Sequence, residues 1–394
     1  MKIAILNTFY YPDEPGGAEK SVRILAESLL ALGNEVHVIC LGNSPESIKF
    51  NGVAINRMKI DNLYLPIGNS HKMWFERIAW HTIDSYNFWA SNTLEKALAV
   101  IKPDVLHTNN LGGISVAAWT LAKRLGIPVV HTTRDFYLMC PQTTMLKGDI
   151  SCKNVCAGCL PFSIPRKIVS KSISSVIGIS KFILDRHISQ GYFSDVRSSV
   201  IYNPFNARDS TYTSHGREVQ LGFIGRLVPA KGIELLIDAF RIVLLSGVRA
   251  RLLIAGVGLP EYENSLRQTA ATMPIDFLGH VEPDSFFPSI DLTVVPSIWQ
   301  EPLGRVAIES IAFGRPVVVT PVGGLPELIN RQYGAIASEV TADSLAEEIK
   351  NMISRVANEG QEIYHAAIAA ATKFLPLEIA KQYNVVYKAA SVRN

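Results

Sequence analysis

The segment Pro296–Glu327 reads PSIWQEPLGRVAIESIAFGRPVVVTPVGGLPE and contains signals for a loop, a helix and a strand in succession. Gly304 follows a proline-containing turn, and the apolar spacing after it predicts a helix from about Arg305 to Phe313. Gly314 ends this helix, and Val317–Thr320 is predicted as a strand. The segment is therefore typical of an α/β protein in which strands and helices alternate.

Two carboxylates lie in this segment, Glu301 on the loop and Glu309 within the predicted helix. A helix N-terminus offers unpaired backbone N–H groups and a positive dipole end, which favour a phosphate. Glu309 lies about 7–8 Å along the axis from that end, at about 1.5 Å per residue. The offset matches the separation between a nucleotide's diphosphate and its ribose hydroxyls. The turn Val322-Gly323-Gly324 can bring further N–H groups to the same ligand.

The same alternation runs through both halves of the chain, which predicts parallel βαβ units and two domains. The scheme restarts near residue 218, after a polar stretch without periodicity. We predict an N-terminal Rossmann-like domain over 1–205, a linker over 206–217 and a C-terminal domain over 218–375. The last segment, 376–394, is predicted as a helix that can pack on either domain, including back on the first.

Composition restricts the class of protein. The chain has 394 residues, of which 48% are hydrophobic and 19% charged, so a globular protein with two cores is expected. A net charge of +3 is too small to indicate nucleic acid as a partner. No apolar run reaches the roughly 20 residues that a membrane span needs, and the start of the chain resembles a first strand rather than a signal peptide. We expect a cytoplasmic location, including the inner surface of the membrane.

A second charged pattern follows the predicted strand Val219–Ile224. The sequence GRLVPAKG places Arg226 at the end of this strand and Lys231 at the start of the next predicted helix. An arginine fork and a lysine point charge together suit a diphosphate. An exposed, solvated pair is the ordinary alternative, and the pattern gains weight from the segment around Glu301.

Three stretches of the chain resemble the retaining family-4 glycosyltransferases, which have the two-domain GT-B fold. The first is PGGAEKSVRILAESLLALGNEVHVIC near the N-terminus, the second is FIGRLVPAKGIELLIDAF, and the third is EPLGRVAIESIAFGRPVVVTPVGG with its Glu-x7-Glu spacing. The resemblance covers nearly the whole chain in the expected order. It implies two Rossmann-like, doubly wound parallel-sheet domains that face each other across a cleft.

The resemblance also implies roles for the matching residues. Arg226 and Lys231 would bind the donor diphosphate, Glu309 the ribose and Glu301 the hydroxyls of the transferred sugar. Backbone N–H groups around Leu303, Gly304 and Arg305 would hold phosphate or sugar oxygens. Gly16 and Gly17 would let the first loop approach the donor, and His131 would lie near the reacting face of the sugar. By itself, His131 in VVHTTRDF also fits a packed histidine at a strand end.

These assignments favour a retaining enzyme that transfers a hexose from a UDP- or GDP-sugar to a glycan, lipid-linked or small-molecule acceptor. The sequence has no Asp-x-Asp, so we expect the diphosphate charge to be stabilised by cationic side chains without a metal. A nucleotide-sugar epimerase of the same fold and a noncatalytic nucleotide-sugar binder are the alternatives. A dinucleotide oxidoreductase is disfavoured because the first strand does not lead into G-x-G-x-x-G.

The segment Trp74–Ala99 is rich in aromatic residues. We interpret it as a long helix with an aromatic core face, the alternative being a surface for a lipid or an acceptor. Arg166, Lys167 and Lys171 form a small basic group, predicted as a solvated helix face, with contact to anionic lipid as the alternative.

Four of the five cysteines cluster in a loop-rich insertion over 140–160. Cys140, Cys152, Cys156 and Cys159 are spaced C-x11-C-x3-C-x2-C, which suits four thiolates around a structural Zn²⁺. Unlinked thiols, disulfides and an iron–sulfur cluster are the alternatives. Cys40, in an apolar strand, is predicted as core.

Overall fold

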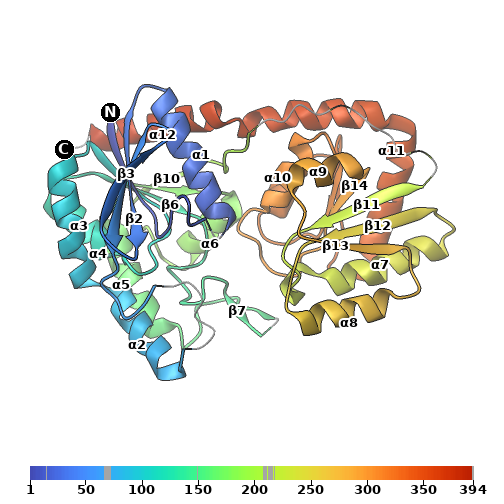
Figure 1. Ribbon diagram of the computed structural model, residues 1–394, viewed down its shortest axis with the longest axis horizontal. Coiled ribbons are helices and arrows are strands. Elements are labelled where there is room, and N and C mark those ends of the chain that lie inside the picture. The colour runs from blue at the N-terminus through green and yellow to red at the C-terminus, as the bar shows by residue number, and fades with distance from the viewer. Residues whose placement is uncertain are drawn as a thin grey trace. The chain divides into compact units, whose positions relative to one another are not determined.

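Two parallel sheets organise the chain in the computed structural model, which describes residues 1–14, 16–65, 72–148, 150–206, 211, 216 and 218–392 (Figure 1). The chain divides into two units. The first comprises Met1–Lys147, Cys152–Pro204 and the segment from Pro376 onward, and the second comprises Phe205–Leu375 with Gly148–Ser151. The predicted linker, 206–217, lies largely outside the described residues.

The first unit is built on an eight-stranded sheet with the order β10-β9-β6-β5-β1-β2-β4-β3. All neighbouring strands are parallel except the edge pair β3–β4. Its strands are β1 (Lys2–Leu6), β2 (Glu35–Gly42), β3 (Glu46–Phe50), β4 (Val53–Lys59), β5 (Val105–Thr108), β6 (Val129–Thr133), β9 (Ser175–Gly178) and β10 (Arg197–Val200). The central strands β5 and β6 are buried along their whole length, as expected of a parallel sheet covered on both faces.

Helices cover both faces of this sheet (Figure 1). The helices are α1 (Gly17–Ala31), α2 (Trp74–Ser85), α3 (Phe88–Ile101), α4 (Ala117–Arg124), α5 (Leu160–Val169), α6 (Lys181–Ser189) and α12 (Pro376–Ser391). The side chain of Asn87 caps α3, and that of Ser180 caps α6, by accepting a first-turn N–H. The short strands β7 (Leu146–Lys147) and β8 (Ile150–Ser151) belong to neither large sheet.

The C-terminal helix α12 packs on α1 and forms part of the core of the first unit. Tyr383 and Tyr387 are buried there, and each also makes a polar contact. The Tyr387 hydroxyl lies 2.8 Å from His107 Nδ1, and the Tyr383 hydroxyl lies 3.1 Å from Thr132 Oγ1. Helix α12 is thus joined to strands β5 and β6 by both apolar packing and hydrogen bonds.

The second unit has a six-stranded, wholly parallel sheet with the order β13-β12-β11-β14-β15-β16. Its strands are β11 (Val219–Ile224), β12 (Ala250–Ala255), β13 (Ile275–Gly279), β14 (Leu292–Val295), β15 (Val317–Val319) and β16 (Gly334–Ile336). Its helices are α7 (Ile233–Leu245), α8 (Pro260–Ala270), α9 (Pro283–Phe286), α10 (Arg305–Ala312) and α11 (Ala342–Ala371), the last interrupted at Glu359. The predicted α/β class with two parallel-sheet domains is confirmed.

Candidate active site

The loops that follow β11 and β14 meet at the carboxyl end of the second sheet. The two strands are neighbours, with Leu221 opposite Leu292. Beyond their ends, the backbone N–H groups of Ile298 and Trp299 donate to the carbonyl oxygen of Ala230, at 3.1 and 3.2 Å. A Cβ atom at Gly232 would lie 2.0 Å from the carbonyl oxygen of Pro296, so this close approach requires glycine. Ligands of open parallel sheets bind at this kind of edge.

Lys231 and Glu301 form an ion pair across these two loops. Lys231 Nζ lies 2.7 Å from Glu301 Oε1, and the Ser297 hydroxyl donates to the same carboxylate oxygen. The carboxylate side chain is 8% exposed and the lysine side chain 21%, so the pair lies at the edge of solvent. Residues 70 positions apart in the chain are thereby brought into direct contact.

Helix α10 begins at the next point along this edge. Gly304 precedes it with a φ of 99°, a left-handed conformation that favours glycine, and a Cβ there would lie 2.2 Å from Leu325 Cδ2. One turn into the helix, Arg305 Nε lies 2.7 Å from Glu309 Oε1. Glu309 is 10% exposed, and a carboxylate with one arginine partner can accept further hydrogen bonds.

The turn after β15 closes against the same loop. The Gly324 N–H donates to the carbonyl oxygen of Glu301 at 2.8 Å, and the Gly323 N–H donates to Gln300 Oε1 at 2.9 Å. The predicted second glycine turn therefore contacts the Glu301 loop, although these two N–H groups have protein partners in this structure.

Arg226 follows β11 and is exposed. In the part of the second unit that the structure describes, no acidic side chain forms an ion pair with it. The guanidinium of Arg226 is thus available to a ligand on the same loop that presents Lys231. Leu303 lies beneath this surface and is 2% exposed, so its contribution to a ligand would be limited to its backbone.

The remaining predicted residues belong to the first unit. Gly16 is the N-cap of α1 and Gly17 its first residue, and this N-terminus follows β1. Glu19 lies in the first turn and is 5% exposed. Burial raises the pKa of Glu19, while the charge of Arg134 lowers it.

His131 is a buried residue of β6, 3% exposed. Its Nδ1 lies 2.9 Å from Thr108 Oγ1, and its ring packs against Trp119 at 4.8 Å between ring centroids. Burial, with a smaller contribution from His187, lowers the pKa of His131 to about 3, so its imidazole is neutral at physiological pH. The structure thus places this histidine in the packing of the first unit, and its catalytic role stays a prediction.

The sequence analysis missed a polar group next to His131. Arg134 follows β6, is 6% exposed, and donates to Asn109 Oδ1 at 2.8 Å and to Asn203 Oδ1 at 2.5 Å. Arg134 Nη2 and Asn109 Nδ2 are buried donors without a partner among the described residues. Unsatisfied buried donors cost free energy that a ligand oxygen would recover. The available signal was the polar run TTRD, which ends one buried strand and continues into the loop after it.

The structure does not support the predicted zinc site at the four clustered cysteines. Cys156 Sγ lies 3.3 Å from Cys159 Sγ, just before α5. Burial raises the pKa of Cys152 and that of Cys159, and Cys140 lies close enough to both thiols to raise the pKa of each further. Among the described residues, no group of three or more His, Cys, Asp and Glu side chains is arranged to hold a metal ion. All five cysteines are free thiols, and Cys40 is core as predicted.

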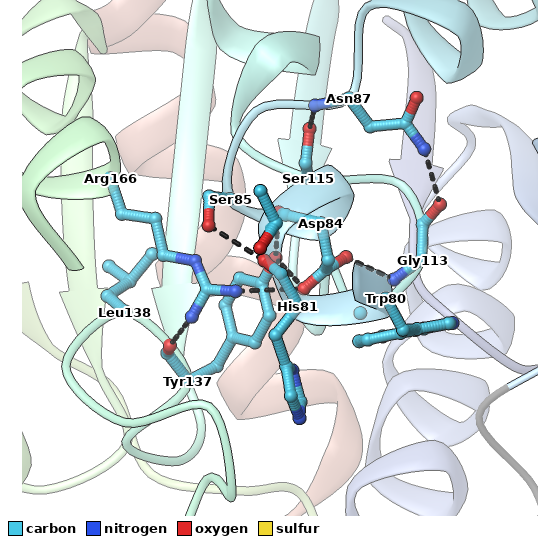
Figure 2. A network of polar contacts seen from close by, with 12 residues as sticks. Trp80, His81, Asp84, Ser85, Asn87, Gly113, Ser115, Tyr137, Leu138 and Arg166 are labelled. Atoms are coloured by element: carbon cyan, nitrogen blue, oxygen red, sulfur yellow. Dashed lines mark hydrogen bonds and ion pairs between the residues drawn. The ribbon is translucent and has the colours of Figure 1, made fainter. Parts of the chain in front are cut away.

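Two further predictions about the first unit were wrong. The aromatic segment forms two helices, α2 and α3, and most of its aromatic side chains are exposed: Trp74 at 72%, Phe75 at 49%, Phe88 at 59% and Trp89 at 63%. Within the same unit, Arg166 is not on a solvated face. It is fully buried and pairs with Asp84 at 2.8 Å (Figure 2).

The chain matches two family models that follow one another along the sequence. Residues 15–208 match Glycosyltransferase Family 4, and residues 209–374 match Glycosyl transferases group 1. The chain is 36% identical to an uncharacterised 42.6 kDa protein in the cps region of Klebsiella pneumoniae, over 83% of this chain and 87% of that one. It is 28% identical to an uncharacterised glycosyltransferase of Methanocaldococcus jannaschii, over 99% of this chain and 98% of that one.

Solved structures share the fold. The Anabaena protein Alr3699/HepE, crystallised with UDP-glucose, superposes with a TM-score of 0.68 at 19% identity, covering 99% of this chain and all of that one. The chain is therefore a family-4 glycosyltransferase of the GT-B fold, as the sequence resemblance predicts. In the described part of the chain, no helix combines the length and apolarity needed to span a bilayer.

Proposed function

We propose that this glycosyltransferase transfers a hexose, with retention of anomeric configuration, from a UDP- or GDP-sugar to a glycan, lipid-linked or small-molecule acceptor. The donor would bind at the carboxyl end of the second sheet. Lys231 and Arg226 would hold the diphosphate, Glu301 the hexose hydroxyls and Glu309 the ribose. Backbone N–H groups of the Leu303–Arg305 turn would add hydrogen bonds to phosphate or sugar oxygens.

The observation that carries this proposal is the contact of 2.7 Å between Lys231 and Glu301. In a nucleotide sugar, one bridging oxygen joins the β-phosphate to the anomeric carbon. A cation for the phosphate and a carboxylate for the sugar must therefore lie next to each other, as these two groups do. A ribose ligand at Glu309, one turn into α10, would lie on the other side of the diphosphate.

Transfer makes the nucleoside diphosphate a leaving group that gains negative charge. Arg226 and Lys231 would be positioned before the reaction, so they stabilise that charge without reorganisation at the transition state. The N-terminus of α10 would add unpaired N–H groups and a favourable dipole. These groups supply the role that a divalent metal has elsewhere, which agrees with a sequence that lacks Asp-x-Asp.

Retention is proposed to follow from a front-face reaction in which the leaving phosphate takes the acceptor's proton. Glu301 is the nearest carboxylate to the site of transfer in this proposal. Its ion pair with Lys231 and its bond from Ser297 favour a role in binding sugar hydroxyls over one as a nucleophile.

The UDP-glucose complex of the Anabaena structure supports a nucleotide-sugar donor by likeness of fold. The test is a screen of UDP-, GDP- and ADP-sugars by thermal shift, followed by product analysis with and without a chelator. We expect one base to raise the melting temperature and full turnover in chelator. Donor turnover that survives Glu301→Ala would contradict the site assignment. Conversion of the donor to its epimer without transfer would make the enzyme an epimerase, and binding without turnover would make it a binder.

A further inference from the structure

A hollow lies in the first unit, at the carboxyl ends of β4, β5 and β6. It has a volume of about 540 Å³ and is bounded by α2 and by the loops after those strands. Side chains from these elements form its wall: Tyr64, Arg77, Trp80, His81, Gln142 and Thr143. We call it the α2 pocket. It combines aromatic rings with a few amide, hydroxyl and imidazole groups, as small-molecule sites do.

The α2 pocket carries positive charge that is not neutralised by a neighbour. Within the described residues, Arg77 forms no ion pair, and Lys72 Nζ lies 5.0 Å from the centre of the Tyr64 ring. His81 Nδ1 is buried and lacks a partner there. Burial, followed by the charges of Arg166 and Arg77, lowers the pKa of His81 to about 4, so the neutral ring can exchange hydrogen bonds with a ligand.

A buried ion pair fixes the wall of the α2 pocket (Figure 2). Asp84, in the last turn of α2, accepts from Arg166 at 2.8 Å, from the Tyr137 hydroxyl at 2.8 Å and from the Gly113 N–H at 2.6 Å. The Arg166 guanidinium also lies 3.9 Å from the centre of the Tyr137 ring. Tyr137 lines the pocket, and Arg166 belongs to α5, so the network holds α2, α5 and the pocket wall in one arrangement.

Helices α2 and α5 pack together and leave large apolar side chains in solvent. On α2 these are Trp74, Phe75 and Ile78, exposed by 72%, 49% and 49%, and on α5 they are Leu160, Ile164 and Ile168, exposed by 48%, 45% and 66%. We call these six residues the apolar ridge. The spacing of those on α5 places them along one helix face.

The charges beside the apolar ridge are mostly positive. Lys167 on α5 and Lys171 shortly after it are exposed, as are Arg77 on α2 and Lys72 just before α2. Helix α2 has two acidic side chains: Asp84 is buried, and Glu76 is partly exposed and accepts from the Met73 N–H at 2.8 Å. Helices that present aromatic and aliphatic groups between cations bind the surface of anionic bilayers.

We propose that the α2 pocket binds the phosphate-bearing saccharide head of a membrane lipid acceptor while the apolar ridge rests on an anionic bilayer. The proposal deepens the function proposed above and rests on it. A lipid-linked phosphosaccharide joins an anionic, hydroxyl-rich head to an apolar chain. The first unit places a cationic, polar pocket beside exposed apolar helices in the same way.

Vesicle sedimentation tests the apolar ridge. The triple variant Trp74→Ser/Ile78→Ser/Ile164→Ser should lose about tenfold in binding to phosphatidylcholine vesicles that contain phosphatidylglycerol. The matched control, Leu245→Ser/Leu259→Ser, removes apolar side chains exposed by 82% and 72% in the second unit and should bind as the wild type does. Equal binding by the triple variant and wild type would overturn the proposal. A triple variant that binds vesicles as the wild type does but has a different oligomeric state by light scattering would also overturn the proposal.

Calorimetry tests the α2 pocket, with farnesyl phosphate, farnesol and glucose 1-phosphate as probes. We expect farnesyl phosphate to bind most tightly and Arg77→Gln to weaken it about tenfold, as expected for a charge-assisted contact. Arg124→Gln, which removes an exposed arginine from α4 of the same unit, should have no effect. Equal binding of glucose 1-phosphate and farnesyl phosphate would assign the pocket to a soluble phosphosugar and overturn the lipid.

Failure of this proposal can be told apart from failure of the proposed function. The same protein samples are titrated with UDP and GDP, whose binding depends on the second unit. Nucleotide binding without vesicle or farnesyl phosphate binding overturns the lipid acceptor alone. If the wild-type protein binds neither UDP nor GDP, the proposed donor site is overturned instead. Circular dichroism of each variant shows whether it folds.

Discussion

Charged residues are used differently in the two units. In the second unit, the ion pairs Lys231–Glu301 and Arg305–Glu309 lie at the edge of solvent, on loops and a helix start. In the first unit, Asp84 and Arg166 are completely buried. An ion pair at the edge of solvent can exchange its partner for a ligand at a low cost in free energy. Opening a buried pair leaves an unpaired charge in the protein interior, which costs much more. The second unit therefore has the charges suited to chemistry, and the first uses this pair as a structural support.

Breaking the buried pair should have the largest effect. Asp84→Ala leaves Arg166 as an unpaired buried cation, so we expect the first unit to lose about 3–5 kcal/mol of stability. Urea unfolding, monitored by the fluorescence of a tryptophan in the first unit, measures the loss of stability. The double variant Asp84→Leu/Arg166→Met should recover most of it, since it removes both charges. An unchanged unfolding midpoint in Asp84→Ala would contradict the contrast between the units.

Breaking the solvent-edge pair should affect catalysis and leave stability nearly intact. Lys231→Ala should lower kcat/KM by about 10²–10³-fold, the range found when a preorganised electrostatic group is lost. Steady-state transfer assays measure this, with Arg241→Ala on α7 as the control because that arginine is exposed and pairs with Asp238 on the same helix. If Arg241→Ala lowered kcat/KM as much as Lys231→Ala, or if Lys231→Ala strongly destabilised the protein, the distinction between catalytic and structural ion pairs would not hold.

Acid should weaken the first unit because its buried histidines are neutral. Burial lowers the pKa of His131 to about 3 and that of His187 to about 4, against about 6.5 in the unfolded chain. The unfolded state then binds more protons, so the stability from these residues is complete above pH 6.5 and falls as the pH drops toward 4. By pH 5 each histidine should cost about 2 kcal/mol.

A carboxyl whose pKa is raised opposes this trend, and Asp135 is the example for which the shift is large. Burial raises the pKa of Asp135 to about 6, so the folded state binds its proton more readily and gains stability as the pH falls below 6. Thermal melts from pH 4 to pH 8 give the sum of these effects, and His131→Gln should flatten the profile. If His131→Gln leaves the slope of melting temperature against pH unchanged, this histidine is not held buried and neutral in the folded state.

The smallest effect is expected at the start of α10. Arg305→Gln removes a partly exposed i,i+4 partner of Glu309, and we expect a stability change within about 0.5 kcal/mol. Nucleotide affinity should also change little, because the proposed ribose contact is made by Glu309. Chemical denaturation and calorimetry together measure both values. A loss as large as that of Lys231→Ala would mean that Arg305 itself binds the donor.

The sequence predicted the second unit better than the first, for a physical reason. The residues from Gln300 to Gly324 form a local loop, helix, strand and turn, and local glycine and proline signals predict such elements well. The contact between Lys231 and Glu301 could be anticipated because both follow strands of one parallel sheet. The α10 helix was predicted to within one residue at its C-terminal end.

The first unit depends on contacts that no local pattern contains. Arg166 appeared to lie on a solvated basic face because its partner Asp84 is 82 residues away. The exposed aromatic residues of α2 have the helical spacing of a core face, and the sequence gives no sign of whether a partner covers them. The cysteine spacing suited zinc and the four thiols do lie near one another, yet among the described residues they are not arranged to hold a metal ion.

The central claim is that Arg226 and Lys231 bind a nucleoside diphosphate without a metal ion. The direct measurement is calorimetric titration of wild-type protein, Arg226→Ala and Lys231→Ala with UDP and GDP in the presence of a chelator. The account predicts wild-type binding of one diphosphate and at least a tenfold loss in each variant, about 1.4 kcal/mol, with a smaller change for the corresponding monophosphate. Equal affinities in all three proteins, or binding only after magnesium or manganese is added, would contradict it.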